Sequence, residues 1–190
     1  MIFGFDFDNT LINYDNIFYK LALKDQLIGK NFKRNKETIK KNLIKNKKIA
    51  EWKKLQSAVY SQEIEKAKPN RKFISIFRFL KKSKIKFYVI SHKTKFPYSG
   101  KKINLHKVSR KWLNKNIFNK KNKIGKCKYY FEPSIKKKIL RIKKLKITHF
   151  IDDLKIIIDM LPNNIKKIQY KNNTFKVLSI KKLIKKDLSN

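Results

Sequence analysis

Acidic residues and cysteine are scarce in this chain. It has 13 Asp and Glu against 51 Lys and Arg in 190 residues. Its single cysteine, Cys127, excludes a disulfide within the chain and a cysteine-based zinc site, and we expect it to be a structural strand residue. No apolar run approaches the roughly 18 residues of a membrane helix. Asp6 and Asp8 interrupt the place where a signal peptide would carry its apolar segment. We therefore expect a cytoplasmic protein without a membrane segment.

Arginine is also rare, and this rarity bears on whether the net charge of +38 indicates nucleic-acid binding. Neutralisation of phosphates by Lys and Arg drives non-specific binding to nucleic acids, so a chain this basic is a candidate nucleic-acid-binding protein. Only five of its basic residues are Arg, however, whereas specific readers of bases and phosphates rely on the bidentate Arg fork. The lysines are spread from end to end, as a composition bias of the whole proteome would also produce. Nucleic acid is the weaker of the candidate partners.

The apolar residues, 41% of the chain, suffice for a core. They lie in strand-like segments that alternate along the chain with helical ones. Strand-like segments at 2–6, 85–90, 127–131, 147–151 and 166–170 alternate with helical patterns at 70–84, 105–118, 134–145, 154–161 and near the C-terminus. This alternation predicts an α/β fold with a Rossmann-like core of three layers, in which a mostly parallel sheet lies between helices.

Residues 16–67 interrupt the alternation. They contain no convincing strand and predict three helices, near 16–28, 36–46 and 50–67. We expect a small α-helical cap at 16–67 inserted into a core formed by 1–15 and 68–190. On the third of these helices, Trp52, Gln56 and Tyr60 share one face. This face either packs against its neighbours or presents Gln56 to a substrate.

Four of the predicted strands are followed directly by, or end in, a polar side chain: Asp6, Ser91, Glu132 and Asp152. Ligands of parallel sheets bind outside the carboxyl ends of the strands, so these side chains should converge at one edge. Two of the positions carry paired acids, because Asp8 follows Asp6 and Asp153 follows Asp152. Carboxylates this close repel one another, and a hard cation such as Mg²⁺ relieves the repulsion. Alternatively, the second pair caps the helix that follows it.

The segment from Asp6 to Leu11, DFDNTL, resembles the DxDxT motif that opens the haloacid dehalogenase-like (HAD) superfamily, most of whose members are Mg²⁺-dependent phosphatases. Further motifs of this family follow in order over most of the chain, namely Ser91 after the strand FYVI and the paired acids after THFI. The segment 16–67 matches the position of the family's small helical cap. The loop that begins SHKT resembles a subgroup of unassigned substrate, so Lys93 and Thr94 are candidate phosphate neighbours or parts of a solvated loop.

The family's phosphate-binding lysine has to be chosen among 46 lysines. The helix predicted over 134–145 has an apolar face formed by Ile135, Ile139, Ile142 and Leu145. Lys138 falls within this face, whereas Lys136 and Lys137 point away from it. A buried lysine requires an anionic partner, unless its ammonium reaches back to solvent. Lys138 is therefore the candidate, with Lys136 and Lys137 as fallbacks.

The resemblance implies a role for each motif residue. Asp6 would attack phosphorus and form an aspartyl-phosphate, and Asp8 would act as general acid and then as general base. Mg²⁺ would be held by Asp6, the backbone carbonyl of Asp8, Asp152 and Asp153. The candidate phosphate-binding residues are Thr10, Ser91, His92 and Lys138.

The expected function is Mg²⁺-dependent hydrolysis of a small phosphorylated metabolite, with a sugar phosphate as the leading candidate. The alternatives are a nucleic-acid-binding protein or polynucleotide 3′-phosphatase, a non-catalytic HAD-like partner protein, and phosphotransfer to an acceptor other than water. Glu132 is either a turn residue or a group that orients the loop or a substrate hydroxyl. His106 and His149 are expected to be structural. The sequence leaves the oligomeric state open.

Overall fold

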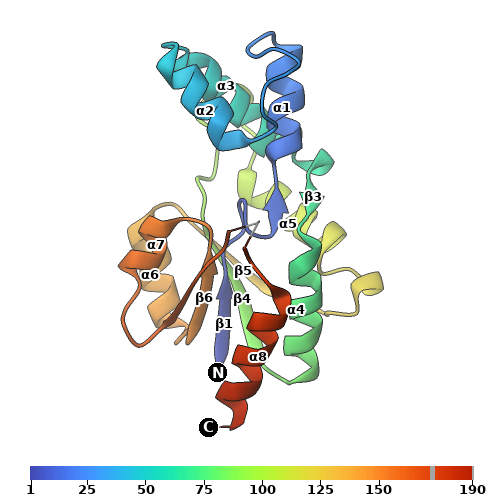
Figure 1. Ribbon diagram of the computed structural model, residues 1–190, viewed down its shortest axis with the longest axis vertical. Coiled ribbons are helices and arrows are strands. Elements are labelled where there is room, and N and C mark those ends of the chain that lie inside the picture. Colours follow the sequence, from blue (N-terminus) through green and yellow to red (C-terminus); the bar gives the residue numbers. More distant parts are fainter. Residues whose placement is uncertain (172–173, 190) are drawn as a thin grey trace.

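A five-stranded sheet runs through the centre of the lower part of the molecule (Figure 1). The computed structural model describes residues 1–171 and 174–189. The strands of the sheet are β1 (Ile2–Phe5), β4 (Lys86–His92), β5 (Lys128–Glu132), β6 (His149–Asp152) and β7 (Lys166–Gln169). Their order is β5-β4-β1-β6-β7, and every neighbouring pair is parallel. The predicted α/β fold with a parallel sheet is confirmed.

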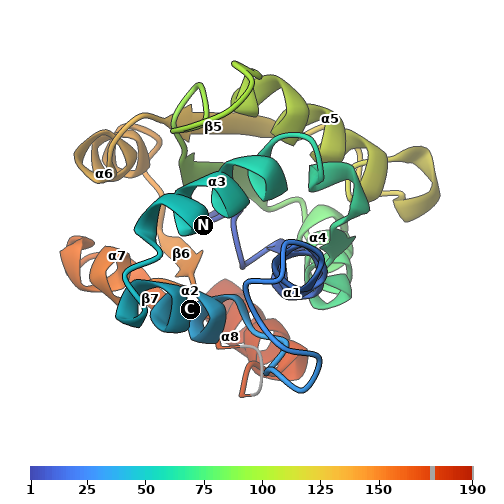
Figure 2. The same ribbon diagram turned by 90° about the horizontal axis from the view of Figure 1, so that it is seen from above.

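Helices cover both faces of this sheet and complete three layers (Figures 1 and 2). One face carries α4 (Arg71–Lys82), α5 (Leu105–Asn116) and α8 (Val177–Ser189), and the other carries α6 (Ile135–Lys144) and α7 (Lys155–Met160). None of the helices in the described ranges is long and apolar enough to cross a membrane.

The pleat of β1 divides its side chains between the two layers. Phe5 points toward α4, where its ring meets Phe77 at a centroid distance of 4.7 Å and an interplanar angle of 65°. Such edge-on contacts are the favoured geometry of aromatic pairs. Gly4 points the other way, and its Cα is packed against the ring of Phe150. Successive residues of this continuous apolar strand therefore pack against different layers.

Three further helices lie together above the carboxyl ends of the strands (Figure 1). They are α1 (Asp15–Lys24), α2 (Lys36–Lys45) and α3 (Ile49–Tyr60), and we call them the three-helix unit. Their interior includes Phe18, Ile39, Leu43 and Val59, each 0% exposed. Asn35 caps α2 by accepting a hydrogen bond from the Thr38 amide at 2.9 Å.

The two chain segments that join the three-helix unit to the sheet pair with each other. β2 (Ile12–Asn13) and β3 (Lys68–Pro69) form a short antiparallel ladder. The Asn70 side chain reinforces the junction by donating to the Thr10 carbonyl at 3.1 Å and to the Tyr170 hydroxyl at 2.6 Å. Strands of two residues have too few positions to show an alternation, so the sequence did not predict them.

Several elements differ in extent from the prediction. β1 ends at Phe5, so Asp6 and Asp8 lie beyond the strand rather than on one of its faces. The chain turns here because Asn9 adopts a left-handed φ of 58°, which Asn tolerates better than most residues. β4 is longer than expected and includes Ser91 and His92. The predicted helix over 50–67 ends at Tyr60 and is followed by a 3₁₀ turn, η1 (Ile64–Lys66).

We predict that Gly4→Ala destabilises the fold by about 1–3 kcal/mol, as expected for overpacking of a close-packed interior. A Cβ at this position would lie 2.5 Å from Cδ2 of Phe150, which the adjacent strand holds in place. The matched control is Gly29→Ala, where no atom lies within 4 Å of the new Cβ. Urea unfolding followed by circular dichroism measures both variants, and equal unfolding free energies would contradict the prediction.

Candidate active site

A cavity of about 220 Å³ lies between the carboxyl ends of the strands and the three-helix unit. The strand side contributes Asp6, Asp8, Ser91, Lys138 and Asp153 to its wall. The three-helix unit contributes Lys36, Gln56, Ser57 and Tyr60. Asp6 and Ser91, which end separate strands in the sequence, thus meet in one place, as parallel strands with a common direction require, whereas Glu132 does not line the cavity.

Lys138 lies at the floor of this cavity between two carboxylates. Its Nζ is 2.5 Å from Oδ1 of Asp6 and 2.6 Å from Oδ2 of Asp152, and the residue is 1% exposed. Burial opposes the charge of Lys138, but the two carboxylates outweigh it and raise its pKa. The structure thus brings the lysine on the apolar face of α6 to the paired acids, while Lys136 and Lys137 are exposed.

Asp6 receives a second hydrogen bond at the same oxygen. The Ser91 hydroxyl donates to Oδ1 of Asp6 at 2.9 Å, so Lys138 and Ser91 both bind Oδ1. Among the described residues, Oδ2 of Asp6 accepts no hydrogen bond. One carboxylate oxygen is therefore fixed and the other is available to a ligand.

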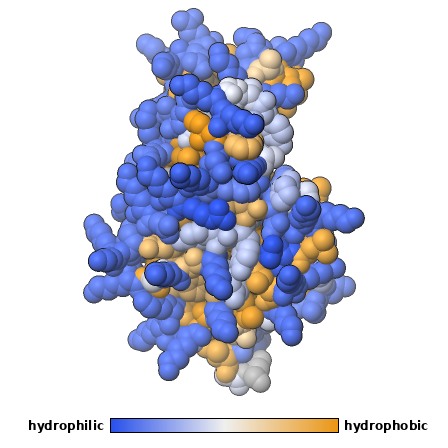
Figure 3. Space-filling model, turned by 180° about the vertical axis from the view of Figure 1, so that it is seen from behind, coloured by the Kyte–Doolittle hydropathy of each residue, from blue (hydrophilic) through white to orange (hydrophobic). Residues whose placement is uncertain are grey.

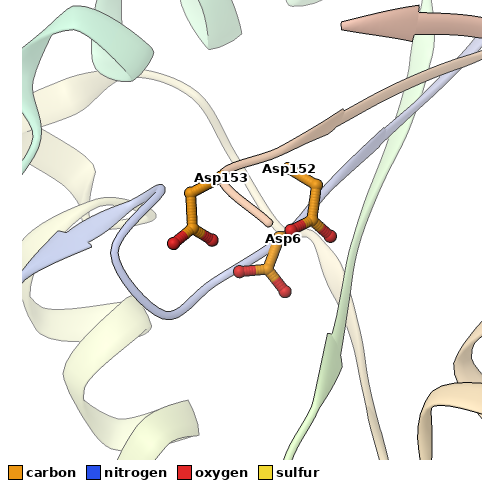
Figure 4. A group of neighbouring side chains, drawn as sticks. All are labelled: Asp6, Asp152 and Asp153. Atoms are coloured by element: carbon orange, nitrogen blue, oxygen red, sulfur yellow. The ribbon is translucent and has the colours of Figure 1, made fainter. Parts of the chain in front are cut away.

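Three carboxylates gather at the ends of β1 and β6 (Figure 4). One oxygen each of Asp6, Asp152 and Asp153 lies within 4.8 Å of the others. Burial and the neighbouring carboxylates raise the pKa of Asp6 well above its usual range despite Lys138, and they raise the pKa of Asp153 to about 6. An all-oxygen set in which the charged forms are penalised is the donor chemistry that suits a hard divalent cation. These residues therefore fit Mg²⁺.

Asp152 also binds the backbone just before α7, but it does not cap this helix, whose N-cap is Leu154. Its Oδ1 accepts the backbone amide of Leu154 at 2.9 Å, at the residue that precedes α7. Its Oδ2 binds Lys138. The two oxygens of one carboxylate thus bind the chain before α7 and the floor of the cavity, and the capping interpretation of the paired acids is wrong.

Asp8 is held by two side chains from different parts of the fold. Nζ of Lys93 lies 2.9 Å from both of its oxygens, and the Tyr14 hydroxyl donates to Oδ1 at 2.7 Å. Lys93 is 4% exposed and packs over the rings of Phe7 and Tyr60 at 5.3 and 4.7 Å. This arrangement fixes the direction of the Asp8 carboxylate on the wall of the cavity.

The other candidate phosphate neighbours occupy different positions. His92 and Thr94 line the cavity, and burial together with the charge of Lys138 lowers the pKa of His92. Thr10 does not belong to the described cavity wall. It is 0% exposed, and its Oγ1 has no hydrogen-bond partner within the described chain. Of the four candidates, Ser91, His92 and Lys138 are brought together and Thr10 is not.

Glu132 and His106 lie outside the cavity wall. Glu132 is bound to Arg141, with 2.7 Å between Oε1 and Nε, and its backbone carbonyl accepts the Lys93 amide at 2.8 Å. His106 binds the Lys93 carbonyl at 2.8 Å through Nε2. Glu132 and His106 therefore support the segment that carries Lys93. Trp52 stacks on Phe18 at 5.2 Å, so only Gln56 and Tyr60 of the aromatic face reach the cavity.

The sequence did not single out Tyr14 or Lys36, although both belong to the neighbourhood of the cavity. Tyr14 contacts Asp8, and Lys36 lines the wall from the first turn of α2. Tyr14 lies four residues after Thr10, the last residue of the DxDxT motif, and could have been marked by that proximity. Lys36 carries no signal among 46 lysines, because its position depends on how the three-helix unit is placed above the sheet.

The fold is similar to that of a solved structure described as a HAD-superfamily hydrolase from Ehrlichia chaffeensis. The two chains are 18% identical, and the similarity covers 97% of this chain and 96% of that one with a TM-score of 0.55. No family model matches the sequence, and no curated protein matches it. The similarity confirms the fold that the resemblance to the HAD superfamily implied.

We predict that Lys138→Met lowers the free energy of unfolding by about 3–5 kcal/mol, because it leaves buried carboxylates without their partner. Lys137→Met is the matched control, since Lys137 is exposed on the same helix. Denaturant unfolding of both variants measures the difference. A Lys138→Met protein as stable as the control would show that this ion pair does not hold the floor together.

Removal of a carboxylate should have the opposite effect. Because burial and Asp152 raise the pKa of Asp153 to about 6, its charge costs folding energy at neutral pH. Asp153→Asn should therefore stabilise the metal-free protein by about 1–2 kcal/mol, or a few degrees in Tm. The same substitution should weaken the rise in Tm that Mg²⁺ produces in the wild type.

Thermal melts with Mg²⁺ and with a chelator test both effects. The exposed Asp159, which pairs with Lys155, gives the control Asp159→Asn. Metal-free Asp153→Asn that melts below the wild type, or an unchanged response to Mg²⁺, would contradict the prediction.

Proposed function

We propose that the protein is a HAD-superfamily phosphohydrolase that hydrolyses a small phosphoric monoester with Mg²⁺ through an aspartyl-phosphate. The observation that carries this proposal is the cavity in which Asp6 and Asp8 face Ser91, Lys138 and a further carboxylate. The shared fold with a structure described as a HAD-superfamily hydrolase supports it. Because fold alone does not define an activity, the side chains of the cavity bear most of the weight.

In the first step Asp6 is the nucleophile. One of its oxygens is held by Lys138 and Ser91, so the other is oriented for attack on phosphorus. The P–O bond to the leaving group breaks as the bond to Asp6 forms, and Asp8 gives its proton to the leaving oxygen. Lys138 and Ser91 also stand where they can bind the phosphoryl oxygens, on which the transition-state charge develops.

In the second step water replaces the leaving group. Asp8, now ionised, takes a proton from the water, whose oxygen forms the new bond to phosphorus. The bond between phosphorus and Asp6 breaks, inorganic phosphate is released, and both carboxylates return to their initial states. Lys93 and Tyr14 hold the ionised form of Asp8 in place for this proton transfer. An alcohol in place of water would give phosphotransfer instead.

Asp6, Asp152 and Asp153 are the side chains that would hold Mg²⁺, with the Asp8 carbonyl as a further ligand by analogy with the family. When bound, Mg²⁺ neutralises phosphoryl charge and relieves the repulsion between these carboxylates. The donor set and the raised pKa values of Asp6 and Asp153 support this assignment.

The size of the cavity favours a small metabolite over a polynucleotide. About 220 Å³ of space accommodates a phosphoryl group and a small organic group, but not a chain of nucleotides. On the face shown in Figure 3, hydrophilic side chains are spread from top to bottom of the molecule among several hydrophobic patches, rather than gathered in one groove. The net charge of +38 would still attract phosphorylated ligands through its long-range field.

We predict Mg²⁺-dependent release of phosphate from p-nitrophenyl phosphate. Asp6→Asn should reduce the rate by at least about 10³-fold, since it removes the nucleophile. Asp8→Asn should reduce it by about 10²-fold or more, since it removes the general acid and base. Asp25→Asn is the control, because Asp25 is exposed on the three-helix unit.

Metal-dependent turnover that survives Asp6→Asn would refute the aspartyl-phosphate mechanism. A wild type that neither turns over phosphate esters nor binds Mg²⁺ would refute the catalytic proposal, and partner or nucleic-acid binding would then be tested. Nucleic-acid binding would have to fall steeply with salt and yet persist at physiological ionic strength.

A further inference from the structure

Lys36 places a largely buried positive charge on the part of the cavity wall that the three-helix unit forms. It is the first residue of α2, and its side chain is 12% exposed. The backbone amide of Lys36 donates to Oδ1 of Asp15 at 2.9 Å, which fixes the start of the helix. Its Nζ lies 5.9 Å from the ring centres of both Phe18 and Tyr60. The ammonium is thus held between aromatic rings at the top of the cavity.

The other two lysines of the cavity wall are already matched by buried or partly buried carboxylates. Lys138 binds Asp6 and Asp152, and Lys93 binds both oxygens of Asp8. Lys36 has a different partner, Glu37, at 3.5 Å, and the Glu37 side chain is 58% exposed. An exposed ion pair at this distance contributes little. Within the described cavity wall, Lys36 is therefore the lysine that forms no ion pair with a buried carboxylate, although Asp8 and Asp153 interact with it electrostatically over a longer distance.

The charge of Lys36 persists at neutral pH. Burial lowers the pKa of Lys36, but the electrostatic influence of Tyr60, Glu37 and Asp8 outweighs burial and raises it. An ammonium held away from water is costly unless an anion accompanies it. A ligand that brings a negative group to this end of the cavity would supply the missing partner.

Two neighbours on α3 provide further hydrogen-bond donors. Gln56 and Tyr60 are one helical turn apart and both line the cavity. Nζ of Lys36 lies 5.9 Å from the centre of the Tyr60 ring, so the ammonium is next to this pair of side chains. An ammonium, an amide and a phenol that converge in this way form a donor set for an anion. Lys36 also borders a neighbouring cavity, but its contact with Tyr60 directs the ammonium to the cavity of Asp6.

We propose that the substrate carries a second anionic group, a carboxylate or a second phosphate, which Lys36 binds together with Gln56 and Tyr60. The proposal rests on the proposed function, because it takes the reacting phosphoryl group to lie at Asp6. Pro97, Leu105 and Ile157 line the wall and suit a short carbon chain between the two anions. A substrate of this class differs from a sugar phosphate with an uncharged leaving group.

The test uses non-hydrolysable phosphonates, so that it does not depend on turnover. Phosphonoacetate, 3-phosphonopropionate and 4-phosphonobutyrate are compared with alkyl phosphonates of equal length, and ethylene-1,2-bisphosphonate represents the second phosphate. Isothermal titration calorimetry in the presence of Mg²⁺ measures their affinities for the wild type, Lys36→Met and Lys36→Arg. Lys41→Met is the matched control, since Lys41 is exposed on the same helix. Lys36→Gln serves as a second neutral variant if Lys36→Met fails to fold.

The wild type should bind at least one doubly anionic probe about 10- to 100-fold more tightly than its uncharged counterpart, as expected for a charged hydrogen bond. The neutral variants should lose this preference, Lys36→Arg should retain part of it, and Lys41→Met should retain all of it. Whether carboxylate or bisphosphonate probes show the preference identifies the kind of anion.

Equal affinities for charged and uncharged probes in the wild type, or an equal loss for both in Lys36→Met, would overturn the proposal, as would the absence of binding by every probe. Phosphate release from p-nitrophenyl phosphate is measured in parallel. A preference that depends on Lys36 in a protein without turnover would uphold the anion site and refute the hydrolase. Turnover in a protein that shows no preference for the doubly anionic probes would support the hydrolase and refute the anion site.

Discussion

The ion pairs of Lys138 with Asp6 and Asp152 are the interaction on which the arrangement of the cavity depends. They join the ends of β1 and β6 to the first turn of α6, and Asp6 and Lys138 are 132 positions apart in the sequence. A buried ammonium between two carboxylates is stable only as a set, since the removal of one member leaves uncompensated charge. Lys138 is the lysine on the buried face of α6, and the pairing of β1 with β6 brings its two carboxylate partners together. The surplus of carboxylate charge that remains is what makes the site suitable for a divalent cation.

Lysine has two separate roles in this protein. The net charge of +38 comes from side chains that mostly lie on the surface and act at long range, where salt screens them. Lys36, Lys93 and Lys138 are instead largely buried and act over single contacts. Substitution of a buried lysine and of an exposed lysine on the same helix changes the net charge equally. A difference between the two variants therefore reports the single contacts of the buried lysine. The few acidic residues show the same contrast, since four of the 13 lie at or beside one cavity.

The sequence indicated those parts of the site that are encoded in regular elements. Asp6, Ser91 and Asp152 follow apolar strands, and parallel strands bring their carboxyl ends to one edge. Lys138 was distinguished by its position on a helix face, for which a period of 100° per residue is sufficient. Such patterns could not indicate Lys36. Periodicity shows which face of a helix packs on its own core, but it does not show how the three-helix unit is placed above the sheet. The ladder of β2 and β3 was missed for a related reason, as two residues do not define an alternation.

The side chains of the proposed anion site pack against those that orient Asp8. Tyr60, which contacts Lys36, also lies 4.7 Å below the ammonium of Lys93 and 4.9 Å from the ring of Tyr14. Lys93 and Tyr14 are the two side chains that bind Asp8. A ligand that displaces the Tyr60 ring therefore changes the packing around both partners of the proposed acid and base. Because close-packed interiors transmit small displacements rather than absorb them, the group that reads the far end of a substrate is mechanically linked to the carboxylate that would transfer its proton. Recognition by the three-helix unit and chemistry at the sheet are then parts of one continuous structure.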